Sequence, residues 1–64
     1  MLRVNGEMVA AAGKTVAELL TMLGYPLNMV AVERDGRIIP RANWDSEILT
    51  DDAVIEVVRF VGGG

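Results

Sequence analysis

Apolar and polar positions alternate over residues 2–4, and a second strand-like run follows over residues 7–10, so this stretch predicts a β-hairpin. Asn5-Gly6 interrupts the alternation, and Asn-Gly is the preferred pair for a two-residue type I′ turn because both positions need a positive φ. Such a turn places Leu2 opposite Val9 on one face of the hairpin. Three apolar side chains of this face are expected in the core: Leu2, Val4 and Val9.

The next stretch has the spacing of an amphipathic helix, with one apolar stripe formed by Val16, Leu19, Leu20 and Leu23. Thr15 and Glu18 have the spacing of a capping box, in which both side chains accept hydrogen bonds from N–H groups at the helix start. Gly24 stands where a helix ends in the left-handed conformation, and Pro26 prevents its continuation. The sequence therefore predicts a short helix over residues 16–23 with one buried face.

A β-branched run over residues 29–33 predicts a third strand. Asp35-Gly36 has the same turn preference as Asn-Gly, so residues 38–39 are expected to return as a short strand. Pro40 ends this strand, because proline lacks the N–H group that a sheet ladder uses.

The segment that follows has weaker signals. Residues 41–44 are expected to be irregular or a single helical turn, and residues 45–49 a brief strand before a turn over 50–53. Trp44 is expected to cover one end of the core with its indole N–H left in water.

Residues 54–61 form the longest β-favouring run, which is apolar on both faces apart from Glu56 and Arg59. This pattern suits a central strand that the helix covers on one side, with an interaction surface on the other. Parallel pairing of the first and last strands would place the helix across a mixed sheet of four to five strands. The expected fold is therefore α+β, in the β-grasp (ubiquitin-like) arrangement.

The last strand continues into three glycines. We expect residues 1–61 to form the β-grasp domain and residues 62–64 to form a flexible tail. One interpretation is a frayed end without a function. The other is that the tail carries the terminal carboxylate of Gly64 into the active site of another protein, since glycines have no Cβ and can thread a narrow channel.

Composition excludes several classes of function. The chain has 64 residues, of which 52% are hydrophobic, so it is expected to form one small domain with a dense core. It contains neither Cys nor His, which removes thiolate metal sites and the commonest general base and argues against a self-sufficient enzyme. A net charge of −3 without a basic run argues against nucleic-acid binding. The absence of a long apolar run or a signal-peptide pattern argues against membrane association and predicts a cytoplasmic protein.

Five segments together carry a resemblance to a known family: residues 4–7, 15–20, 30–33, 36–41 and 57–64. In their order and total length the chain resembles the ThiS family, the ubiquitin-like sulfur carriers of thiamin (thiazole) biosynthesis. The resemblance covers essentially the whole chain. Such carriers commonly stop at a Gly-Gly pair, whereas this chain has a third glycine, which leaves Gly63 as an alternative to Gly64 for the reactive terminus.

The resemblance implies a carrier cycle. A ThiF-like adenylyltransferase would use ATP to adenylate the Gly64 carboxylate, and a sulfur donor would displace AMP to leave a thiocarboxylate. A ThiG-like thiazole synthase would then accept the sulfur. The chain would be a protein cosubstrate rather than an enzyme, a monomer when free, with no cofactor or metal of its own.

Partner contacts are expected at the end of the last strand and in the tail, at Phe60, Val61, Gly62 and Gly63. The outward side of the last strand would dock on the activating enzyme, with the alternative that Phe60 belongs to the core. Arg41 and Arg59 either contact acidic groups of a partner or remain solvated.

Other functions remain open on the sequence alone. A molybdopterin-synthase small subunit, or a carrier of another thiolation pathway, would use the same tail chemistry. A ubiquitin-like protein modifier is a further alternative, although a single lysine, Lys14, argues against self-linked chains. A non-catalytic β-grasp interaction module is the alternative of another class.

Overall fold

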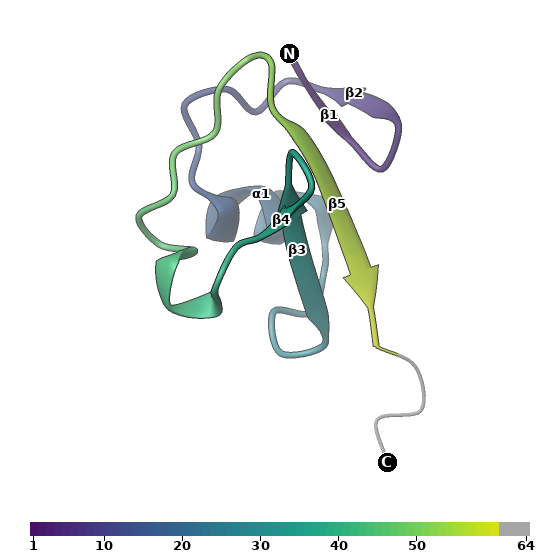
Figure 1. The fold of residues 1–64 in the computed structure, drawn as a ribbon, viewed down its shortest axis with the longest axis vertical. Coiled ribbons are helices and arrows are strands. Elements are labelled where there is room, and N and C mark those ends of the chain that lie inside the picture. The colour runs from purple at the N-terminus through teal and green to yellow at the C-terminus, as the bar shows by residue number, and fades with distance from the viewer. Residues whose placement is uncertain (61–64) are drawn as a thin grey trace.

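The computed structural model describes residues 1–60, which form one five-stranded mixed sheet with a helix across one face (Figure 1). The elements are β1 (Leu2–Val4), β2 (Glu7–Val9), α1 (Val16–Leu23), β3 (Val30–Arg34), β4 (Arg37–Ile38), the 3₁₀ helix η1 (Arg41–Asn43) and β5 (Val54–Arg59). The strand order is β2-β1-β5-β3-β4, with β1 and β5 parallel and the other neighbours antiparallel. This is the expected β-grasp arrangement, and β5 is its central strand.

The first hairpin has the predicted register, with Leu2 paired to Val9. Asn5 and Gly6 have φ values of 50° and 84°, as a type I′ turn requires. Leu2 and Val4 are buried, whereas Val9 is half-buried and packs against the edge of the core. The hairpin prediction is therefore confirmed, with Val9 less enclosed than expected.

Helix α1 begins and ends at the predicted residues. The Thr15 side chain accepts a hydrogen bond from the Glu18 N–H at 3.1 Å, and the Glu18 carboxylate accepts one from the Thr15 N–H at 2.8 Å. Gly24 ends the helix at φ 80°. The prediction of a buried stripe was wrong at Leu23, which is 40% exposed and lines an open groove together with residues of the first hairpin.

The second hairpin differs slightly from the prediction. β4 contains Arg37 and Ile38, and Ile38 is exposed on the outer side of this edge strand. Ile39 leaves the strand and is buried, while its N–H still donates to the Val32 carbonyl at 2.9 Å. The return strand therefore begins and ends one residue earlier than expected.

Two expectations for the following segment were wrong. The indole N–H of Trp44 is not left in water, because it donates to the Ile39 carbonyl at 3.0 Å in a buried position. No strand forms over residues 45–49, where only an isolated bridge joins Ile48 to Thr15. The predicted helical turn is present as η1.

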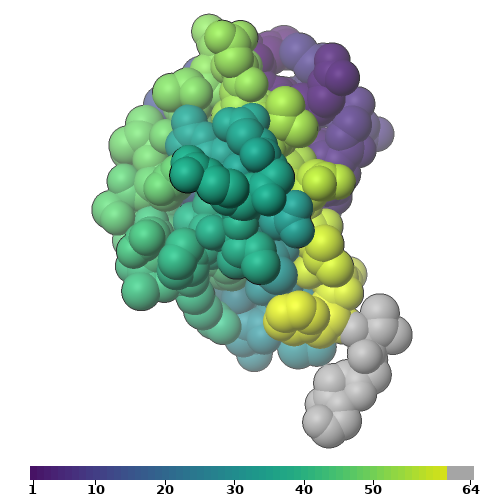
Figure 2. All heavy atoms as spheres, viewed as in Figure 1, coloured from purple at the N-terminus to yellow at the C-terminus, as the bar shows by residue number. Residues whose placement is uncertain are grey.

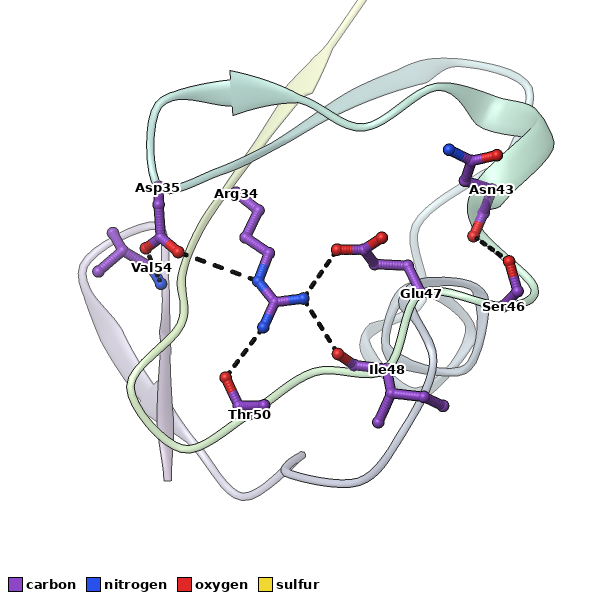
Figure 3. A network of polar contacts seen from close by, with 8 residues as sticks. All are labelled: Arg34, Asp35, Asn43, Ser46, Glu47, Ile48, Thr50 and Val54. Atoms are coloured by element: carbon purple, nitrogen blue, oxygen red, sulfur yellow. Dashed lines mark hydrogen bonds and ion pairs between the residues drawn. The ribbon is translucent and has the colours of Figure 1, made fainter.

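Arg34, at the end of β3, holds this irregular segment to the sheet (Figure 3). Its guanidinium donates to the Glu47 carboxylate at 2.7 Å, to the Ile48 carbonyl at 3.0 Å and to the Thr50 hydroxyl at 2.9 Å. Asp35 lies on the other side of the guanidinium, with its Oδ2 3.9 Å from the Arg34 Nε. Its Oδ1 accepts a hydrogen bond from the Val54 N–H at 3.0 Å. The hydrogen bonds of Arg34 therefore attach residues 47–50, which form no strand, to the end of β3.

The core lies between α1 and the sheet. Its fourteen buried residues are Leu2, Val4, Ala11, Val16, Leu19, Leu20, Val30, Val32, Ile39, Trp44, Leu49, Ala53, Ile55 and Val57. None of the buried residues in the described part of the chain is polar or charged. The predicted boundary between a domain ending at residue 61 and a tail at 62–64 lies outside the described residues.

Candidate partner-docking face

Strand β5 is buried on the side facing α1 and open on the other, which we call the outward face. Ile55 and Val57 point into the core, whereas Val54, Glu56 and Val58 are exposed. Figure 2 shows β5, in yellow-green, open to the viewer between β1 and the β3–β4 hairpin. The expectation of a central strand with one free apolar side is therefore confirmed.

The backbone stays tied to the sheet up to the last described residue. The Phe60 N–H donates to the Met29 carbonyl at 2.8 Å, so the pairing of β5 with the start of β3 continues one residue beyond the strand. The Phe60 side chain is 51% exposed and lies on the outward face by its alternation with Val58. The alternative that Phe60 belongs to the core is therefore wrong. A docking role for Phe60 stays a prediction.

Val61, Gly62, Gly63 and Gly64 lie outside the described residues, so their predicted roles also stay predictions. What the structure provides is the position from which they start. Figure 1 shows β5 running the length of the molecule to the end opposite the N-terminus. The pairing of β5 within the sheet therefore fixes the place where the chain leaves residue 60.

Asn5, which follows β1, is hydrogen-bonded to β5 on the side of β5 away from β3. Its Oδ1 accepts a hydrogen bond from the Val57 N–H at 2.8 Å, and its Nδ2 donates to the Tyr25 hydroxyl at 3.1 Å. Pairing of the β1 and β5 backbones extends only to Val4 and Ile55, so this side chain continues the ladder where β1 has ended. The sequence suggested only a turn at Asn5, because nothing local indicates a partner in the last strand.

The outward face also holds two carboxylates directly opposite one another. Glu33 of β3 and Glu56 of β5 are paired residues in the antiparallel ladder. Glu56 stood out in the sequence as a charge in an apolar strand, but its partner did not, because only the register of β3 against β5 brings the two together. Ile38, which pairs with Glu33 from β4, and Val58 add exposed apolar surface beside them.

The two arginines considered as partner contacts differ in their surroundings. Arg59 is exposed at the end of β5, in register with Val30. The guanidinium of Arg41 lies 5.6 Å from the centroid of the Trp44 ring, a cation–π arrangement. Arg41 thus has a packing role on Trp44, while no contact in the described part of the chain assigns one to Arg59.

Charge chemistry within the described residues is modest. The backbone hydrogen bond from Thr15 holds the pKa of the Glu18 carboxyl below its ordinary value, and this group belongs to the helix cap rather than to the outward face. Among residues 1–60 no group of three acidic side chains is placed to hold a metal ion. The single α-helix of this part is too short to cross a membrane. The outward face offers exposed apolar side chains and the Glu33 and Glu56 carboxylates for contact.

Comparison with known proteins identifies relatives over the full length of the chain. The model of the ThiS family matches residues 2–64. The sulfur carrier protein ThiS of Bacillus subtilis is 38% identical over 66 residues, which cover 100% of both chains. A crystal structure of the thiamine biosynthesis protein ThiS from Geobacter metallireducens superposes with a TM-score of 0.80 at 34% identity, covering 98% of this chain and 97% of that one.

A second kind of relative is a larger protein. A thiazole synthase of Magnetococcus marinus is 42% identical over 64 residues, which are 98% of this chain. The match occupies 20% of that protein, so this chain spans about a fifth of its length.

Proposed function

The chain belongs to the ThiS family, and on that premise we propose that it is a sulfur carrier protein of thiamin biosynthesis and has no catalytic activity of its own. The observation that carries the proposal is that the family match extends over residues 2–64 and so includes the three glycines. The lack of Cys and His in the sequence agrees with a protein that leaves the chemistry to its partners.

In the proposed cycle, the Gly64 carboxylate attacks the α-phosphorus of ATP bound to a ThiF-like adenylyltransferase, and pyrophosphate leaves. The acyl-adenylate makes the carbonyl carbon electrophilic, since AMP is a far better leaving group than oxide. A donor that supplies sulfur at the oxidation level of sulfide then displaces AMP and leaves a thiocarboxylate. ATP is thus a cosubstrate of the partner enzyme, and this chain needs no cofactor.

The sulfur acceptor in this proposal is a ThiG-like thiazole synthase. The thiazole synthase of M. marinus contains a segment similar to this whole chain, which supports a working relationship between the two kinds of protein. Linking a carrier to its enzyme raises their effective concentration without any new contact. We place the cycle in the cytoplasm, with the carrier a monomer between encounters.

The outward face and Phe60 support the proposal by their position. Four residues follow Phe60, and an extended chain spans at most about 3.6 Å per residue, so the Gly64 carboxylate reaches at most about 14 Å beyond it. An enzyme that takes the carboxylate into its active site must therefore approach the end of β5. Phe60 and Val61 are the residues expected to meet it first, with Gly62 and Gly63 inside the channel.

Mass spectrometry of the protein isolated from its own cells tests this function. We expect a thiol-alkylable group confined to the glycine tail, which in a chain without Cys identifies a thiocarboxylate and also shows which glycine is terminal. Fragmentation is needed because replacing oxygen by sulfur changes the mass nearly as much as oxidation of one of the four Met residues.

A deletion of Gly63 and Gly64 provides the matched control. It should abolish adenylation while leaving thermal unfolding unchanged, since the strands, the helix and the core described above lie within residues 1–60. A terminus that stays unmodified after incubation with ATP, the adenylating enzyme and a sulfur source would overturn the proposal in favour of a β-grasp interaction module.

A further inference from the structure

The outward face brings two like charges together beside exposed apolar side chains, and Arg3 of β1, which pairs with Val54, lies on the same face. Glu33 and Glu56 are direct cross-strand partners, and such side chains have Cβ atoms about 4.5–5.5 Å apart on the same face of a sheet. No ion pair within residues 1–60 involves either carboxylate. Like charges placed directly opposite destabilise a sheet, so this pair lowers the stability of the free chain.

The two carboxylates lie next to exposed apolar side chains. Ile38 is 70% exposed beside Glu33, and Val58 is 53% exposed two residues from Glu56 on the same side of β5. A partner that covers these side chains must also take the two carboxylates out of water. Burying carboxylates without a cation is costly, so only a surface with a matching positive group fits this face.

We propose that Glu33 and Glu56 together bind one arginine or lysine side chain that the adenylating enzyme presents within an apolar contact surface. The inference rests on the proposed function and names the chemistry of the surface that the docking enzyme must carry. A guanidinium suits the site particularly well, because its planar fork of donors can reach two carboxylates at once.

The charge of an ATP-binding site favours the adenylating enzyme as the occupant. Glu56 precedes Phe60 by four residues, which is about 14 Å along a strand, and the tail reaches at most about 14 Å beyond Phe60. The adenylating site must therefore lie within about 28 Å of Glu56 when it holds the Gly64 carboxylate. An enzyme that holds the polyphosphate of ATP surrounds it with cationic groups, and this potential is complementary to the two carboxylates.

The test compares Glu33→Gln, Glu56→Gln and the double variant as substrates of the adenylating enzyme, measured by ATP-dependent pyrophosphate release. Each single substitution removes a charge-assisted hydrogen bond and should raise the KM for the carrier about tenfold, with the double variant raising it about a hundredfold. The kcat should not change, because the tail and its carboxylate are intact. Raising the ionic strength should reduce the difference between the native chain and the variants.

Glu7→Gln is the matched control. It makes the same change in net charge on an exposed residue, but Glu7 pairs with the buried Val4 and so belongs to the face that carries the helix. Its KM should equal that of the native chain. The outward-face variants should also unfold at the same or a higher temperature than the native chain, since they remove a repulsion.

The outcomes separate the inference from the function on which it rests. If the native chain is adenylated but the double variant has an unchanged KM, the carrier function stands and the cation-binding role is overturned. A rise in KM equal to that of Glu7→Gln would also overturn it, because net charge alone would then explain the effect. A native chain that is never adenylated would remove both.

Discussion

The Asn5 side chain completes the edge of the last strand, since its Oδ1 accepts a hydrogen bond from the Val57 N–H at 2.8 Å. The Asn5 N–H itself donates to the Ile55 carbonyl at 2.9 Å, so backbone and side chain of one residue bind two successive inward-facing positions of β5. The strand that leads to the glycine tail is thereby held by the first turn of the chain.

Two substitutions at Asn5 separate the contributions of its side chain and its backbone. Asn5→Gly should lower the free energy of unfolding by about 1–2 kcal/mol, because the Val57 N–H loses its acceptor. Asn5→Ala should cost about 1 kcal/mol more, since alanine resists the positive φ of 50° that glycine accepts. Urea denaturation measures both. Equal stability of the glycine variant and the native chain would show that this hydrogen bond contributes nothing.

The Arg34 network predicts that an arginine is required at this position. Arg34→Lys keeps the charge, but its single nitrogen cannot stand at the positions of both Nη1 and Nη2, which donate to different acceptors on residues 47–50. The Arg34 side chain is only 21% exposed. We expect a loss of about 1–3 kcal/mol in thermal unfolding. Arg37→Lys is the control, because Arg37 is an exposed residue of the next strand and has no ion pair within residues 1–60. Equal losses for the two variants would contradict the proposed role of the network.

The helix cap predicts a pH dependence. The Thr15 backbone hydrogen bond lowers the pKa of Glu18 from its ordinary value of 4.5, so the folded state favours the ionised carboxylate. Its contribution is fully present above pH 4.5 and is lost as the pH falls through the lowered pKa of the folded state. Glu18→Gln can still accept the hydrogen bond but does not titrate there.

Melting temperatures between pH 7 and pH 3 measure this effect. The native chain should be more stable than Glu18→Gln at neutral pH, and the difference should shrink below pH 4.5. A difference that is constant over this range would show that ionisation of Glu18 does not stabilise the helix.

Elements whose ends depend on local chemistry could be predicted from the sequence. The Asn5-Gly6 turn, the Thr15 cap and the Gly24 stop each act within a few residues, so the bounds of the first hairpin and of α1 followed directly. The central position of β5 followed as well, because its apolar run was too long and too two-sided for an edge strand.

Contacts between distant segments could not be predicted in this way. Asn5 and Val57 are 52 residues apart, and no pattern in either segment indicates the other. The opposition of Glu33 and Glu56 depends on the register of two strands, and a shift of one residue would move one of the two side chains to the other face of the sheet. The buried hydrogen bond of the Trp44 N–H could not be predicted either, because its acceptor, the Ile39 carbonyl, becomes available only where the chain leaves β4.

The exposed side chain of Phe60 should matter for docking and scarcely for folding. Phe60→Ala removes an aromatic side chain that is 51% exposed and outside the core, so the free energy of unfolding should change by less than about 1 kcal/mol. An aromatic residue at the centre of a contact surface is often worth more than about 1.4 kcal/mol of binding, so the KM of the adenylating enzyme should rise about tenfold or more. Met22→Ala is the matched control, because Met22 is 46% exposed on α1, behind the sheet from the outward face. If both variants raise the KM equally, the enzyme responds to surface hydrophobicity in general, and Phe60 has no specific place in the contact.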